Sequence, residues 1–240
     1  MLATTRAIVL RSVKYGDTSL ITQLFTEAYG VQTYIVKGVR KSKSNQASLL
    51  QPSTLLHLEI DNHPQKSIQH LKQFQSAHLF QSARESIVKN SVLLFATELL
   101  LRLLPEHAPL PELFEFSFDF FVNTDQRSEA AIANYPLFFI INIGNLMGYE
   151  IKGAYGNQTP YINMGEGCFT DQPAPADTLD AVAVSFLSQL LISEEATISN
   201  LKIPASIRGK LLHWYIDFLR LHSQHMGAMK SLEVLRAILH

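Results

Sequence analysis

The first 78 residues carry short apolar runs separated by turn residues, which is the pattern of β-strands. Leu55–Ile60 alternates strictly, with leucine and isoleucine on one side and His57 and Glu59 on the other, as a half-buried strand does. Five segments follow this type: Arg6–Tyr15, Leu20–Thr26, Val31–Lys37, Leu55–Ile60 and Ser67–Gln75. The fifth is the weakest, because its apolar residues recur at every third position. Five short strands with hairpin connections predict a small closed barrel, for which the OB-fold is a common solution.

From His78 onward the apolar spacing becomes helical. The predicted helices are 79–104, 112–122, one that Ser128 caps and that continues into 137–147 with Gly148 as its stop, then 178–191 capped by Asp177, 207–221, and a short last one from Ser231. Strands followed by helices indicate an α+β protein. We therefore expect an OB-fold barrel over residues 1–80 and an all-helical domain over residues 81–240. A loop-rich insert at 153–177 interrupts the helical domain.

The composition excludes several classes of protein. Apolar residues make up 47% of the chain and charged residues 17%, which is too apolar for a disordered chain. Cys168 is the only cysteine, so neither a disulfide framework nor a multi-thiolate metal site can form. No apolar run reaches the roughly 18 residues that a membrane span needs. Together with the absence of a secretory signal, this predicts a cytoplasmic protein without a membrane contact.

The near-neutral net charge of −1 divides unevenly along the chain. Residues 1–80 contain nine basic and four acidic side chains, a net charge of +5, and the remainder carries −6. The asymmetry indicates two units with different partners, the first of them suited to a polyanion. A modest excess of charge is also common on solvated surfaces.

Signatures of catalysis are missing from the sequence. The segment Gly38–Ser44 lacks the second glycine and the Gly-Lys-Ser ending of a phosphate-binding loop, and no dinucleotide or serine-hydrolase motif occurs. Cys168 has no histidine near it in the insert, so a half-buried thiol is favoured over a nucleophile. We expect no enzymatic activity, no cofactor and no metal site.

A basic loop lies between the third and fourth predicted strands. Its cations have no acidic residue between Glu27 and Glu59 to neutralise them. The predicted DNA-binding set comprises Lys37, Arg40, Lys41, Lys43 and Ser44 of the loop with Arg11 and Lys14 of the first strand. Tyr15, Tyr29 and Tyr34 are candidates for stacking on bases. Phosphate contacts carry no base identity, so binding should tolerate any sequence. The alternative is a solvated, mobile turn.

The order and spacing of several segments resemble the RecO family of bacterial recombination mediators. The segments that carry the resemblance are 5–10, 15–20, 24–26 with Gly30, 36–44, 50–52, 146–149, 221–227 and 230–235. They span nearly the whole chain.

The resemblance implies an N-terminal OB-fold, a helical domain, and binding of single- and double-stranded DNA. It also implies annealing of complementary strands and, with the partner RecR, help for RecA in displacing single-strand-binding protein. The helical domain would contact the C-terminal tail of that protein, for which we select Lys202, Arg208 and Lys210. A DNA repair protein of this kind would be associated with the nucleoid.

The insert departs from the family, since many members hold zinc there with four cysteines and this chain has only Cys168. Packing and hydrogen bonds must hold the insert, or it is mobile. Two other functions stay open. One is an adaptor whose barrel binds peptide or RNA and whose helices dock a partner. The other, less supported, is a hydrolase that uses the insert.

Overall fold

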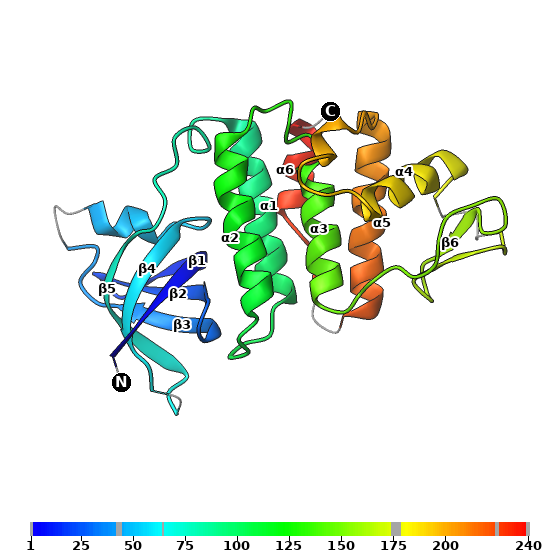
Figure 1. Ribbon diagram of the computed structural model, residues 1–240. Helices are drawn as coiled ribbons and strands as arrows, with labels where there is room; N and C mark the ends of the chain where they lie inside the picture. Colours follow the sequence, from blue (N-terminus) through cyan, green and yellow to red (C-terminus); the bar gives the residue numbers. More distant parts are fainter. Residues whose placement is uncertain (1, 42–44, 64, 174–178, 224–225, 239–240) are drawn as a thin grey trace. The chain divides into compact units, whose positions relative to one another are not determined.

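The computed structural model describes the whole chain except residues 1, 42–44, 64, 174–178, 224–225 and 239–240. The five predicted strands are confirmed, with ends shifted by a few residues (Figure 1). They are β1 (Leu2–Tyr15), β2 (Ser19–Thr26), β3 (Gly30–Val36), β4 (Leu55–Asp61) and β5 (Ile68–Ser76).

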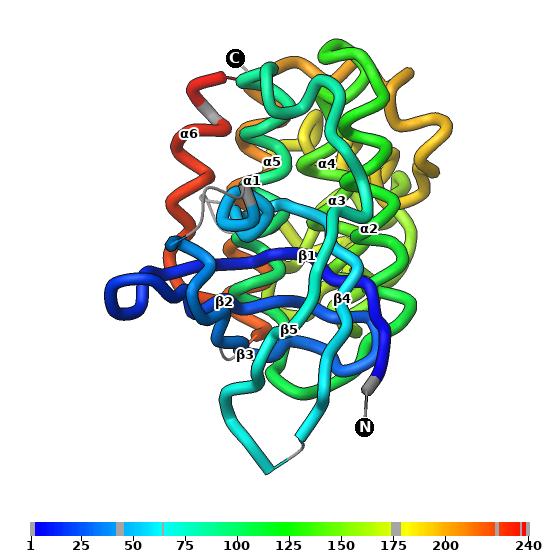
Figure 2. The backbone as a smooth tube through the Cα atoms, turned by 90° about the vertical axis from the view of Figure 1, so that its left-hand side faces the viewer, coloured from blue at the N-terminus to red at the C-terminus, as the bar shows by residue number. Residues whose placement is uncertain are grey.

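The strands close into a barrel in the order β1-β2-β3-β5-β4. All neighbours are antiparallel except β3 and β5, which pair in parallel over Thr33–Ile35 and Ile68–His70. In Figure 2, β1, β2 and β3 run side by side while β4 and β5 cross them. This closed barrel confirms the predicted OB-fold architecture.

Alternation along the strands fills the barrel interior. Leu24 of β2, Tyr34 of β3 and Leu56 of β4 are fully buried, while their neighbours in sequence point outward. A short 3₁₀ helix, η1 (Asn45–Leu50), supplies Leu50 to the same core. The carbonyl of Leu50 accepts a hydrogen bond of 2.6 Å from Ser12 Oγ. The 3₁₀ helix is thereby fixed to β1.

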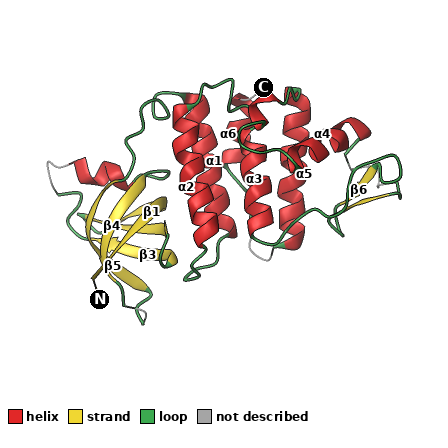
Figure 3. Ribbon diagram, viewed as in Figure 1, coloured by secondary structure: helices red, strands yellow, loops and turns green. Residues whose placement is uncertain are grey.

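Helices follow the barrel, as Figure 3 shows. They are α1 (Ile87–Leu103), α2 (Pro111–Gln126), α3 (Tyr135–Leu146), α4 (Ala181–Leu191), α5 (Ala205–His222) and α6 (Ser231–Ile238), with a 3₁₀ turn η2 (Ile198–Asn200). The insert adds a small hairpin that the sequence did not predict, β6 (Tyr161–Asn163) and β7 (Cys168–Thr170). No helix among the described residues has both the length and the apolarity to cross a membrane.

The first helix starts eight residues later than predicted, at Ile87 instead of Leu79. The intervening segment wraps around the buried carboxylate of Asp125, which accepts hydrogen bonds from the backbone N–H groups of Gln81, Ser82 and Ala83. Those donors are therefore not committed to a helix. Ser86 then caps α1, because its Oγ accepts from the N–H of Lys89.

The starts of α3 and α4 also differ from prediction. Ser128 begins a turn and not a helix, and α3 starts after Asn134, with Pro136 in its first turn, where proline is tolerated. The predicted stop at Gly148 is confirmed by its left-handed φ of 85°. Asp180 caps α4 by accepting from the N–H of Ala183, whereas the predicted cap Asp177 lies outside the described residues.

Hydrogen bonds and packing hold the insert hairpin. Lys152 pairs with it through Lys152 N–H to Gly167 O (2.7 Å) and Phe169 N–H to Lys152 O (3.0 Å). Ile162 and Phe169 are buried. His222, at the end of α5, lies 2.9 Å from the carbonyl oxygen of Met164 and fixes the hairpin to that helix. The described part of the insert is thus ordered without thiolate ligands.

Contacts divide the chain into two compact units, whose bounds differ from the predicted domain ranges 1–80 and 81–240. One unit contains residues 1–85 and 97–126, and the other contains residues 86–96 and 127–240. In the first unit, α2 packs on the barrel through Phe114, whose ring lies 5.2 Å from that of Phe25. The proposed division of the chain into domains at residue 80 stays a prediction.

Candidate nucleic-acid interface

The sides of β1, β2, β3 and β5 that point away from the barrel core are here called the outer face. This face carries a row of apolar side chains. Register places Val13 beside Ile21, Ile21 beside Ile35, and Ile35 beside His70. Ile21 and Ile35 point outward because their neighbours Leu20 and Val36 belong to the barrel core. A second row contains Arg11, Gln23, Thr33 and Ile68.

Large apolar groups on this face are open to solvent. Val13 is 40% exposed, Ile68 43% and the ring of Tyr15 54%. Tyr15 lies at the end of β1 opposite Ser19. A cross-strand patch of this kind is a typical ligand surface of an OB-fold, whose β2–β3 face binds oligonucleotides and oligosaccharides.

Exposed cations lie at the end of the barrel where β1 ends and the chain leaves β3. One of them, Lys14, pairs with the core residue Leu20, so its side chain points away from the outer face. We call this group the cationic rim: Lys14, Lys37, Arg40 and Lys41. Three of them, Lys37, Arg40 and Lys41, belong to the loop after β3. Val39 of this loop is 4% exposed and belongs to the barrel core, so it fixes the loop to the barrel. Gly38 takes a left-handed φ of 71°, which permits the sharp exit from β3.

Two hydrogen bonds from Arg40, one from its backbone and one from its side chain, fasten this loop to the β1–β2 turn. The N–H of Arg40 donates to the carbonyl of Thr18 (2.9 Å), and its Nη1 donates to the carbonyl of Gly16 (3.2 Å). The rim therefore combines residues from two connections, the turn that follows Lys14 and the loop that follows Lys37. Its position is set by the fold and not by one mobile loop.

The charge of the rim is largely uncompensated. Among the residues that the structure describes, neither Arg11 nor any member of the cationic rim takes part in an ion pair. Asp17 lies in the adjoining turn, so the cations outnumber the carboxylate there. A concentration of positive charge at one end of an apolar face attracts phosphate groups.

The structure brings most of the predicted DNA-binding residues together. Lys14, Lys37, Arg40 and Lys41 form the rim at the end of the barrel, and Arg11 lies on the outer face in the second row. Lys43 and Ser44 lie outside the described residues. Of the tyrosines, Tyr15 is exposed, whereas Tyr34 is fully buried and donates its hydroxyl to Gln32. The stacking interpretation is therefore wrong for Tyr34.

Sequence reasoning missed the apolar row. In β2 and β3 every second residue fills the barrel core, and the residues between them point outward. This alternation identifies Ile21 and Ile35 as apolar residues at outward positions, where polar residues are expected. That signal was available in the sequence. The grouping with Val13 and His70 was not, because it depends on cross-strand register.

Two of the three cations selected for partner-tail binding contact groups close to them in the structure. Lys210 Nζ lies 2.6 Å from Asp180 Oδ2, and Arg208 Nη1 donates to the carbonyl of Ile203 at 2.6 Å. Burial lowers the pKa of Arg208. Lys202 is exposed. The charge of Lys210 is thus partly compensated, and the role of these three residues stays a prediction.

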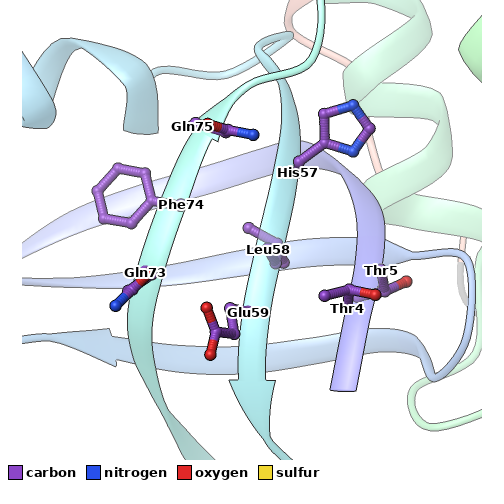
Figure 4. Close-up of a pocket in the computed structure, with 8 residues that line it drawn as sticks. All are labelled: Thr4, Thr5, His57, Leu58, Glu59, Gln73, Phe74 and Gln75. Atoms are coloured by element: carbon purple, nitrogen blue, oxygen red, sulfur yellow. The ribbon is translucent and has the colours of Figure 1, made fainter. Parts of the chain in front are cut away.

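A separate hollow of about 410 Å³ lies on the outside of β1, β4 and β5. Figure 4 shows His57 and Glu59 on β4 and Gln73 and Gln75 on β5 around it. Its lining contains the carboxylate of Glu59 and, among the described residues, no lysine or arginine. This hollow is not suited to phosphate groups.

The thiol of Cys168, in the insert, lies beside a carboxylate. Partial burial and the neighbouring Glu166, whose Oε2 lies 3.6 Å from Sγ, raise the pKa of the Cys168 thiol, which opposes formation of the nucleophilic thiolate. The described part of the chain holds no group of three or more His, Cys, Asp or Glu side chains able to bind a metal ion.

The fold and the outer face define an OB-fold barrel protein with a helical C-terminal region. Comparison with known sequences identifies the family. The model of "Recombination protein O N terminal" matches residues 1–80, and that of "Recombination protein O C terminal" matches residues 84–233. The chain therefore belongs to the RecO family of DNA repair proteins.

Curated relatives cover the full length of the chain. It is 28% identical to the DNA repair protein RecO of Christiangramia forsetii and 26% identical to that of Phocaeicola vulgatus, with 99% of each chain covered in both comparisons. The RecO protein of Salinibacter ruber is 34% identical over 110 residues, which is 46% of this chain and 42% of that protein. The resemblance drawn from the sequence is confirmed.

Proposed function

We propose that the outer face of the barrel binds the backbone of DNA, with the cationic rim and Arg11 contacting phosphates. The observation that carries this proposal is the rim itself, a group of cations that form no ion pair with any described residue and that the β1–β2 turn and the core residue Val39 hold in place. Ammonium and guanidinium groups bind phosphate oxygens without reading base identity. Binding then tolerates any sequence and accepts single and double strands.

The apolar row and Tyr15 supply the second contribution. An exposed ring at the end of β1 gives a base a surface on which to stack, and the row of Val13, Ile21 and Ile35 offers an apolar floor beside it. Such contacts favour unstacked bases and therefore single strands.

The wider role rests on membership of the RecO family. We infer that the protein is a non-enzymatic recombination mediator that anneals complementary strands. With RecR, it would help RecA load onto DNA coated by single-strand-binding protein, whose C-terminal tail the helical region would contact. Lys202, Arg208 and Lys210 remain the proposed tail-binding residues. Association with nucleoid DNA follows from the same proposal.

The salt dependence of DNA binding tests the phosphate contacts. The logarithm of the binding constant for single-stranded DNA falls with the logarithm of salt concentration by about 0.7 per phosphate neutralised. Replacing Lys14, Lys37, Arg40 and Lys41 with alanine should flatten that slope by about 3. A matched variant replaces four exposed cations elsewhere: Lys66, Arg84, Lys152 and Lys230. Equal slopes for the two variants would remove the rim from the site.

An annealing assay tests the mediator role. Complementary oligonucleotides coated with single-strand-binding protein should anneal in the presence of the protein. Annealing should slow when the coating protein lacks its C-terminal tail. The rim variant should anneal slowly on bare strands as well, whereas the matched variant should not.

A second function, peptide binding by an adaptor, is favoured by one observation. The row on the outer face consists of the aliphatic side chains Val13, Ile21 and Ile35, which suit apolar side chains of a peptide as well as bases. Tight binding of a purified protein partner without annealing of DNA would support the adaptor and contradict the mediator.

A further inference from the structure

The loop between α1 and α2 is fastened along the beginning of β3. The N–H of His107 donates to the carbonyl of Val31 at 2.9 Å, and Glu106 forms a parallel bridge with Val31. Gly30 has a φ of 67°, and a Cβ atom built there would lie 2.1 Å from the carbonyl oxygen of Ala108. The backbones approach this closely only because position 30 is glycine.

The same loop contains a strained residue. The backbone of His107 has a left-handed φ of 59°, a conformation that residues other than glycine rarely adopt. Strain of this kind persists only where surrounding contacts enforce it. The hydrogen bond to Val31 and the close contact at Gly30 are such contacts. The loop therefore has a defined position on the barrel.

That position places a carboxylate on the outer face. Gln23 Nε2 donates to Glu106 Oε1 at 3.3 Å, and Gln23 points outward in the row of Arg11 and Thr33. The side chain of Glu106 consequently lies beside Gln23 in this second row. Arg11, directly across from Gln23 on β1, marks the boundary of the half of the face that stays open to DNA. Glu106 itself is exposed.

Glu106 and the cationic rim lie toward opposite ends of β3. The strand starts at Gly30, beside the loop, and ends at Val36, just before Lys37 of the rim. At about 3.3 Å per residue, roughly 13 Å separate Thr33 from Lys37. A strand of DNA that starts at the rim and follows β3 meets the carboxylate after that distance, and like charges repel.

We propose that Glu106 is an electrostatic stop that confines a bound single strand to the half of the outer face nearest the cationic rim. The proposal rests on the proposed function and deepens it, since it names a residue of the α1–α2 loop that sets how long a strand the barrel binds. Glu106 is a positioning residue here, because it limits the path of the strand and does not bind it.

The test measures binding of oligothymidylates from about 4 to 16 nucleotides, the usual range for one OB-fold. The affinity of the unchanged protein should stop rising once the strand fills the available half of the face. In Glu106→Gln, whose amide oxygen still accepts from Gln23, affinity should continue to rise at longer lengths. Binding of the longer strands at low salt should be about threefold tighter. Glu106→Lys should also steepen the salt slope by about 0.7.

Glu112 provides the matched control, because it is an exposed carboxylate six residues further along, in the first turn of α2. Glu112→Gln and Glu112→Lys change the net charge equally but should leave the limiting length unchanged. If the Glu106 and Glu112 variants behave alike, the stop is disproved while DNA binding stands. If the unchanged protein binds no oligothymidylate, the proposed function fails and the stop with it. If Glu106→Lys does not fold, the comparison of Glu106→Gln with Glu112→Gln still tests the proposed stop.

Discussion

The carboxylate of Asp125, near the end of α2, lies 2.9 Å from the Nε2 atom of His78, in the segment that leaves the barrel. Asp125 is 2% exposed and also accepts hydrogen bonds from three successive backbone N–H groups, those of Gln81, Ser82 and Ala83. Burial opposes ionisation, but these donors outweigh it and hold the pKa of Asp125 below its usual range. One side chain thus organises the whole connection between β5 and α1.

Asp125→Asn should destabilise the protein by about 3 kcal/mol at neutral pH, since the charge that three N–H groups and His78 bind is lost. Because the folded pKa is depressed, the stabilisation is fully present above the unfolded pKa of about 3.9 and is lost as the pH falls toward the folded value. Urea unfolding between pH 7 and pH 3 should show a steeper loss for the unchanged protein than for the variant. Asp119→Asn, at an exposed position of α2, should change stability by less than about 0.5 kcal/mol. Parallel pH profiles would contradict this prediction.

Arg6 joins the barrel to α2 within one unit. Its guanidinium binds Glu27 and Glu115 and lies over the rings of Phe114 and Phe118, at 5.5 and 5.0 Å from the centroids. The bond to Glu27 and, despite partial burial, the charge of both carboxylates raise the pKa of Arg6. Arg6→Lys should lose about 1–2 kcal/mol, because an ammonium group cannot make the planar contacts. A midpoint of urea unfolding equal to that of the unchanged protein would refute this.

Gly30 and Gly16 form a matched pair for the loop contact. Both have left-handed φ angles, 67° and 56°, but a Cβ atom at Gly16 meets nothing within 4 Å. Gly16→Ala should cost about 1 kcal/mol, the strain of the left-handed backbone alone. Gly30→Ala adds the clash with Ala108 and should cost about 2–4 kcal/mol. The difference in unfolding free energy between the two variants measures how tightly the loop is fastened.

The insert should depend on His222 and not on a metal. His222→Ala removes the contact with the carbonyl of Met164, so limited proteolysis should cut the insert faster. His213→Ala, at an exposed position of the same helix, should leave the cleavage rate unchanged. A chelator should alter neither the melting temperature nor the cleavage rate. Chelator-induced cleavage would show that the hairpin needs a metal after all.

Tyr15 should contribute to binding of single strands independently of salt. Tyr15→Ala should weaken binding by about 1–3 kcal/mol with an unchanged salt slope, and Tyr15→Phe should retain most of the affinity, because the ring and not the hydroxyl stacks. Tyr155→Ala, in the insert and 38% exposed, is the control and should have no effect. A steeper or flatter slope in Tyr15→Ala would mean that the ring positions cations instead of bases.

The amino-acid sequence by itself determined the elements and much of the chemistry of this protein. Alternation over Leu55–Ile60 and the stop at Gly148 are local signals, and each predicted what the structure contains. The cluster of cations in the loop after β3 could be predicted for the same reason, because charges on a few consecutive residues stay close together in space.

Only the tertiary structure decided which distant residues meet. Three N–H groups that the helix predicted from Leu79 would use donate instead to Asp125, which lies 42–44 residues further along the chain. Register across four strands groups Val13, Ile21, Ile35 and His70 into one row. Periodicity reports the face of one element, whereas such neighbours depend on how elements pair and pack, which no local pattern encodes.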